Sequence, residues 1–62
     1  MNINCLIIDD EPLAINVIKS FIKEIDNITI INTFTSPVDA LKYLKEHTVD
    51  LIFLDINMPL LN

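Results

Sequence analysis

Two short apolar runs that end in acidic residues constrain the fold of this chain more than any other feature. The first run, Cys5 to Ile8, is followed by Asp9-Asp10-Glu11, and the second, Leu51 to Leu54, is followed by Asp55. The first run is short, continuous and apolar rather than alternating, which is typical of a strand buried on both faces of a parallel sheet. The second run is also predicted to be a strand. If the two strands are neighbours, their acidic ends meet at one edge of that sheet.

A helix and a further strand are predicted after the first acidic cluster. Pro12 suits the first turn of a helix, and the apolar residues behind it recur at helical spacing as one stripe. That stripe consists of Leu13, Ala14, Val17, Ile18, Phe21, Ile22 and Ile25. Asp26-Asn27 is expected to close the helix and start a turn. The β-branched segment Ile28 to Phe34 is predicted to be the strand that follows the first one, Ile3 to Ile8.

A second helix is predicted between the second and third strands. Ser36 is a helix cap, Pro37 suits the first helical position, and Asp39 stands in capping-box register. The helix is expected to end near His47. Its inward side chains are expected to be Leu41 and Leu44, helped by Val38 and Ala40. The order strand-helix-strand-helix-strand predicts an α/β fold with a parallel sheet and right-handed crossovers.

The acids fall where a sheet of this kind carries its function. Ligands bind outside the carboxyl ends of the strands, at the point where the strand order reverses, and Asp9, Asp10 and Asp55 all follow predicted strands. Three carboxylates that meet repel one another. A divalent cation such as Mg²⁺, which prefers oxygen ligands, removes that cost. The pattern therefore predicts a metal site with one carboxylate left free to react.

Simpler structural roles compete with that prediction. Acids before a helix favour its dipole, by about 0.3–1 kcal/mol, and Asp55 alone could form a turn. His47 is explained by a favourable interaction with a helix C-terminus. Cys5 is expected to be a small core residue rather than a reactive thiol, and Met58 to be a packing residue.

Composition narrows the class of protein. The 62 residues allow one small domain, yet 52% are hydrophobic. This predicts an exposed apolar face or edge that needs a partner, or membership of a larger domain. The formal net charge is -5 and the four lysines are spread out, so nothing indicates nucleic-acid binding. A single cysteine fits a reducing compartment, the cytoplasm, and no apolar run approaches the ~20 residues of a membrane span.

Two segments resemble a known family. Ile7-Ile8-Asp9-Asp10-Glu11-Pro12 and Leu54-Asp55-Ile56-Asn57-Met58-Pro59 resemble the two signature segments of response-regulator receiver domains, the phospho-accepting modules of two-component signalling. The start of the chain is similar to receivers joined to LytTR-type DNA-binding domains. The resemblance implies a flavodoxin-like (CheY-like) doubly wound parallel sheet, of which this chain would supply the N-terminal β-α-β-α-β half.

The resemblance also implies a role for individual residues. Asp55 would be the phosphoacceptor, taking a phosphoryl group from a sensor histidine kinase. Asp10 and Asp55 would ligate Mg²⁺, Asn57 would add its backbone carbonyl, and Asp9 would act through a bound water. Met58-Pro59 would shape the loop after the third strand. The protein would be a signalling domain rather than an enzyme, with at most self-catalysed phosphoryl transfer and autodephosphorylation.

The chain departs from the family in its length. Receivers usually continue for about as many residues again, and a hydroxyl residue and a lysine at later strand ends complete the site. Residues 1–62 are therefore expected to be a partial receiver domain, truncated after the third strand and the phosphoacceptor loop, that is not competent alone. Any DNA binding would belong to an output domain outside this sequence.

Two alternatives to the receiver remain at this point. One is a phosphotransferase of the haloacid-dehalogenase type, which also uses an aspartate nucleophile, but this class wants a second carboxylate where Asn57 stands. The other is a chemically inert α/β fragment that dimerises through an exposed sheet edge or through helix faces.

Overall fold

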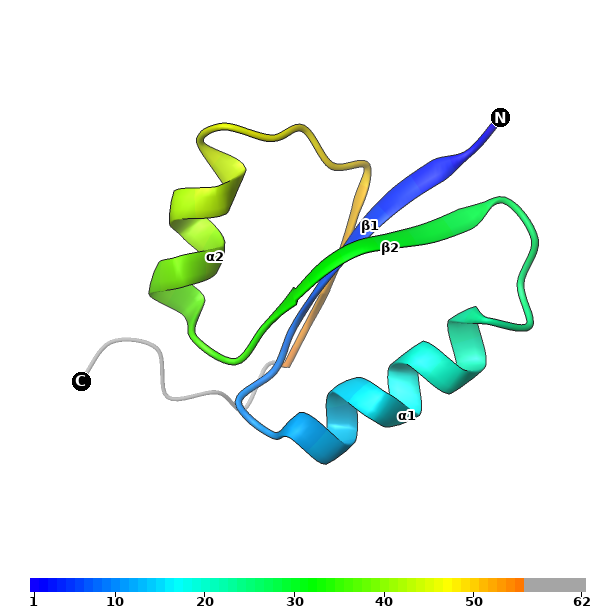
Figure 1. The fold of residues 1–62 in the computed structure, drawn as a ribbon, viewed down its shortest axis with the longest axis horizontal. Coiled ribbons are helices and arrows are strands. Elements are labelled where there is room, and N and C mark those ends of the chain that lie inside the picture. The colour runs from blue at the N-terminus through cyan, green and yellow to red at the C-terminus, as the bar shows by residue number, and fades with distance from the viewer. Residues whose placement is uncertain (56–62) are drawn as a thin grey trace.

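A computed structural model describes residues 1–55 and confirms the predicted order of elements (Figure 1). In chain order they are β1 (Ile3–Ile8), α1 (Pro12–Ile22), β2 (Ile28–Phe34), α2 (Pro37–Leu44) and β3 (Leu51–Leu54). The strands have the bounds expected from the sequence. Both helices end about one turn earlier than expected, at Ile22 and Leu44.

The three strands form one parallel sheet in the order β2-β1-β3. The chain therefore winds from β1 out to β2 and then returns past β1 to β3. Because both crossovers in such a sheet are right-handed, this reversal places the two helices on opposite faces. Figure 1 shows α1 and α2 on either side of the sheet. The predicted doubly wound, flavodoxin-like arrangement is confirmed, and the strand order reverses between β1 and β3.

Strand β1 supplies both halves of the core. Its alternate side chains point to opposite faces, so Cys5 and Ile7 belong to the cluster under α1, whereas Leu6 and Ile8 belong to the cluster under α2. Burial of this central strand on both faces, as the sequence predicts, is confirmed.

The buried face of α1 differs from the predicted stripe. The helix is anchored by Ile15 and Ile22, which are buried, and by Ile18, which packs against them. Four members of the expected stripe are instead exposed, namely Leu13, Val17, Phe21 and, beyond the end of the helix, Ile25. Apolar residues occupy so much of this helix that spacing alone does not choose the face that packs on the sheet.

Helix α2 begins as predicted, but its buried face consists in part of other residues than expected. Ser36 Oγ accepts a hydrogen bond from the backbone N–H of Asp39 at 3.3 Å, which confirms the cap. Ala40 is buried and Leu44 is partly buried, as expected. The predicted inward residues Val38 and Leu41 are exposed, at 56% and 63%.

Two aromatic side chains pack under α2 where Val38 and Leu41 were expected. Tyr43 packs on Phe34 of β2, with 5.3 Å between the ring centroids. Phe34 reaches this face because the register between β1 and β2 shifts after Ile30, leaving Ile31 as an extra residue in β2. An extra residue reverses the alternation of the side chains that follow it.

Strand β3 lies beside β1 at an edge of the sheet formed by residues 1–55. Three of its four side chains, Leu51, Ile52 and Leu54, are exposed, and only Phe53 packs into the core under α1. The expected open apolar edge is therefore present in the part of the chain that the structure describes.

Candidate functional site

Two hydrogen bonds carry the sheet one step past the last residues of its strands. The backbone N–H of Asp9 donates to the carbonyl oxygen of Phe34 at 3.0 Å, and the N–H of Asp55 donates to that of Ile8 at 3.1 Å. The first bond ties the end of β1 to β2, and the second ties the end of β3 to β1. The two acids are thus held by the backbone at the reversal point of the sheet.

The three predicted acids converge at this point. One carboxylate oxygen from each of Asp9, Asp10 and Asp55 lies within 4.8 Å of the other two. Asp9 is buried, with 7% of its surface exposed, Asp55 is half-buried, and Asp10 is exposed. The cluster therefore runs from a buried floor to solvent, so that a ligand can reach it.

The buried member of the cluster has a structural role as well. Asp9 Oδ1 accepts a hydrogen bond from the backbone N–H of Glu11 at 3.0 Å, just before α1. Glu11 is the N-cap residue of α1, but its own side chain makes no capping hydrogen bond. The alternative in which the acids serve the start of the helix thus accounts for one oxygen of Asp9 and leaves Asp10 and Asp55 unexplained. Sequence reasoning did not anticipate the Glu11 amide as the partner of Asp9.

The donor set fits a small divalent cation. Mg²⁺ takes oxygen ligands at about 2.0–2.1 Å in an octahedron, so its ligand oxygens lie within roughly 4 Å of one another. The carboxylate oxygens here lie within 4.8 Å of one another, which is close to that spacing. The three carboxylates repel one another, and a bound cation would offset this repulsion, so their arrangement favours cation binding.

The other residues considered from the sequence lie elsewhere or outside the described residues. Asn57, Met58 and Pro59 belong to residues 56–62, so their expected roles are not part of the described structure. His47 stacks on Tyr43, with ring centroids 3.9 Å apart, and its Nδ1 donates to the Tyr43 carbonyl oxygen at 3.0 Å. This contact agrees with the structural role expected at the end of α2.

Cys5 is fully buried in β1, as predicted for a core residue. Burial raises the pKa of its thiol, because the apolar surroundings disfavour the charged thiolate. A thiol that stays protonated and inaccessible is a poor nucleophile.

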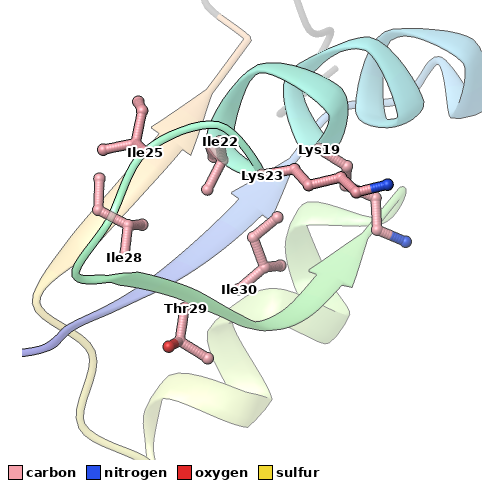
Figure 2. A pocket seen from close by; sticks show the side chains of 7 residues that line it. All are labelled: Lys19, Ile22, Lys23, Ile25, Ile28, Thr29 and Ile30. Atoms are coloured by element: carbon pink, nitrogen blue, oxygen red, sulfur yellow. The ribbon is translucent and has the colours of Figure 1, made fainter.

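A separate hollow of about 410 Å³ lies between the C-terminal end of α1 and the start of β2 (Figure 2). Four isoleucines, Ile22, Ile25, Ile28 and Ile30, line it together with Lys19 and Lys23. The acidic cluster precedes the other end of α1, so this hollow is not part of the candidate site.

The chain is thus a doubly wound α/β domain with an acidic cluster at the point where its strand order reverses. Residues 5–62 match the response regulator receiver domain, and the chain belongs to that family. Membership supports the receiver over the dehalogenase-type alternative.

Several relatives of the chain are named as transcriptional regulatory or sensory transduction proteins. It is 44% identical over 57 residues to the transcriptional regulatory protein YpdB of Escherichia coli K12, and 40% identical over 57 residues to MalR of Bacillus subtilis. It is 42% identical over 53 residues to the sensory transduction protein LytR of Staphylococcus haemolyticus, which agrees with the resemblance to LytTR-type regulators.

These matches cover 92%, 92% and 86% of this chain but only 23%, 24% and 21% of YpdB, MalR and LytR, respectively. The chain thus spans about a quarter of the length of these relatives. No solved structure matches it. Within residues 1–55, no helix is long and apolar enough to cross a membrane.

Proposed function

We propose that Asp55 accepts a phosphoryl group from the phosphohistidine of a sensor histidine kinase. Mg²⁺ would be held by Asp10, by Asp55 and by the backbone carbonyl of Asn57, with Asp9 acting through a water molecule. The observation that carries this proposal is the convergence of Asp55 with Asp9 and Asp10 in a chain of the receiver family.

The chemistry asks little of the protein beyond position and charge. A carboxylate oxygen of Asp55 attacks phosphorus in line with the bond to the imidazole nitrogen. That bond breaks, its electron pair stays on the imidazole, and an aspartyl phosphate forms. When bound, Mg²⁺ supplies positive charge that offsets the phosphoryl oxygens and the neighbouring acids. The hydrogen bond from Asp55 N–H to Ile8 holds the nucleophile at the sheet edge during the transfer.

The wider role follows from the class of protein. We propose that residues 1–62 form the β1-to-β3 part of a receiver, with the hydroxyl and lysine groups that complete such sites in segments outside this sequence. Phosphorylation would then switch the contacts of a cytoplasmic regulator, and any DNA binding would lie in its output domain. The 62 residues alone would not hold a stable phosphate, because the groups that orient it are absent.

The test is labelling of the intact protein by acetyl phosphate in the presence of Mg²⁺. Asp55→Asn is expected to abolish labelling, because an amide oxygen is not a nucleophile toward phosphorus at neutral pH. Asp39→Asn, which removes an exposed acid from α2, is the matched control and keeps it. Labelling of Asp55→Asn at normal stoichiometry would sink the assignment.

Association with a second copy is a separate candidate role for the exposed apolar surfaces. Leu13, Val17 and Phe21 leave one face of α1 uncovered, and β3 leaves an apolar edge open within the described residues. Such edges favour pairing with another chain. A monodisperse 62-residue monomer in sedimentation at micromolar concentration would contradict this role.

A further inference from the structure

Asp50, which lies outside the acidic cluster, is hydrogen-bonded to β1 near the start of that strand, at the end opposite the acids. Asp50 immediately precedes β3, and its backbone N–H donates to the carbonyl oxygen of Asn4 at 2.8 Å. In return, the backbone N–H of Asn4 donates to Asp50 Oδ2 at 2.9 Å. Both backbone groups of Asn4 are therefore bonded to a single residue, once through its backbone and once through its side chain.

This pair carries information about register that the strand itself lacks. All four residues of β3 are apolar, so sliding the strand by one position exchanges one apolar side chain for another on each face. The strand therefore lacks the alternation of apolar and polar positions that marks a buried face, and only the packing of Phe53 favours one register. Backbone ladder bonds do not distinguish positions either, because every residue offers the same N–H and C=O.

The side chain of Asp50 does distinguish them. A shift of one residue would place Val49 or Leu51 opposite Asn4, and neither side chain can accept its N–H. A shift also moves the end of β3 by about 3.3 Å and turns its side chains to the other face. Asp55 would then leave the position in which its carboxylate lies within 4.8 Å of those of Asp9 and Asp10.

We propose that Asp50 is a positioning residue whose carboxylate, bonded to Asn4, sets the register of β3 on β1 and so places Asp55 beside the other two acids. The observed register, from Cys5 opposite Leu51 to Ile8 opposite Leu54, is the one that this pair allows. The consequence at Asp55 rests on the proposed function, whereas the effect on register does not.

Further polar contacts hold this end of β1 in place. The side chain of Asn4 accepts a hydrogen bond from Asn2 Nδ2 at 3.2 Å, and the same Nδ2 reaches Thr29 Oγ1 of β2 at 3.0 Å. Hydrogen bonds of side chains thus link all three strands near their N-terminal ends, on the side of the sheet away from the acids.

The test compares three variants of the intact protein. Asp50→Ala removes the acceptor, Asp50→Asn keeps an oxygen in its place, and Ser36→Ala removes the cap of α2 as a control for general destabilisation. Amide hydrogen exchange in metal-free protein reports on β3, and titration with MgCl₂, followed by NMR at the Asp55 amide, reports on the site.

Asp50→Ala is expected to lower the protection of the β3 amides and to weaken Mg²⁺ binding about fivefold, which is the scale of one lost hydrogen bond. Asp50→Asn is expected to restore both readouts, and Ser36→Ala to change neither at β3. The proposal is overturned if Asp50→Ala matches Ser36→Ala in both readouts, or if Asp50→Asn fails as Asp50→Ala does. If the unmodified protein binds no Mg²⁺, the proposed function fails while the exchange data still decide the role of Asp50.

Discussion

The backbone N–H of Asp55 donates to the carbonyl oxygen of Ile8 at 3.1 Å, which ties the candidate nucleophile directly to the central strand. Ile8 is followed by Asp9 and Asp10, so all three acids take their positions from the last residue of β1. The backbone pairing of β3 with β1 therefore holds Asp55 next to Asp9 and Asp10 in the observed register.

Removing one charge from the cluster should stabilise the metal-free protein and abolish its response to Mg²⁺. Each pair of carboxylates at this separation repels by up to about 1 kcal/mol in a water-like dielectric, so Asp10→Asn is expected to raise the free energy of unfolding slightly in a chelating buffer. Adding MgCl₂ is expected to raise the Tm of the unmodified protein but not that of Asp10→Asn.

Thermal unfolding with and without Mg²⁺ checks this prediction, and Asp39→Asn serves as the control because its carboxylate lies outside the cluster. An equal Mg²⁺ increment in Asp10→Asn and in the unmodified protein would contradict a direct role for Asp10.

Shortening a side chain of the central strand β1 should lower the free energy of unfolding far more than shortening a side chain on the exposed face of α1. Leu6 is fully buried, so Leu6→Ala is expected to lower the free energy of unfolding by about 2–5 kcal/mol. Leu13 is 74% exposed, and Leu13→Ala is expected to change it by no more than about 0.5 kcal/mol. Urea unfolding followed by circular dichroism measures both. Similar losses would show that Leu13 is covered in solution, which self-association would explain.

The stability of the chain should fall at alkaline pH because of Cys5. Burial raises the pKa of this thiol above its ordinary value of 9.0, so the folded state holds the proton more tightly than the unfolded state. The stabilisation is complete below pH 9 and is lost as the pH rises toward the folded pKa. Cys5→Ala is expected to be less stable overall but to lack this contribution. Unfolding curves between pH 7 and pH 10.5 that run parallel for the two proteins would refute the prediction.

The strands and the acidic cluster could be predicted because their signals are local. β1 and β3 are marked by short apolar runs that end in acidic residues, β2 is marked by its β-branched residues, and the reversal point follows from the order of elements. The order of the elements then brings the strand ends that precede Asp9, Asp10 and Asp55 to the same point of the sheet.

The packing of the helices could not be predicted in the same way. Helix α1 carries apolar side chains around much of its circumference, so the choice of Ile15 over Leu13 depends on the shape of the sheet below it. The extra residue Ile31 has no signal in the sequence, and it decides that Phe34 meets Tyr43. Asp50 is likewise an ordinary residue before a strand until its distance to Asn4 is known.

The alternation of buried side chains along β1 has a consequence for how the molecule comes apart. Because one strand supplies Cys5 and Ile7 to the layer under α1 and Leu6 and Ile8 to the layer under α2, we expect that neither layer can unfold and leave the other intact. Loss of either helix would expose one face of β1 to water, and the other helix packs on the opposite face of the same strand. We therefore expect the described part of the chain to unfold as a single cooperative unit. Disruption of β1, the central strand, would unfold both layers of the core together.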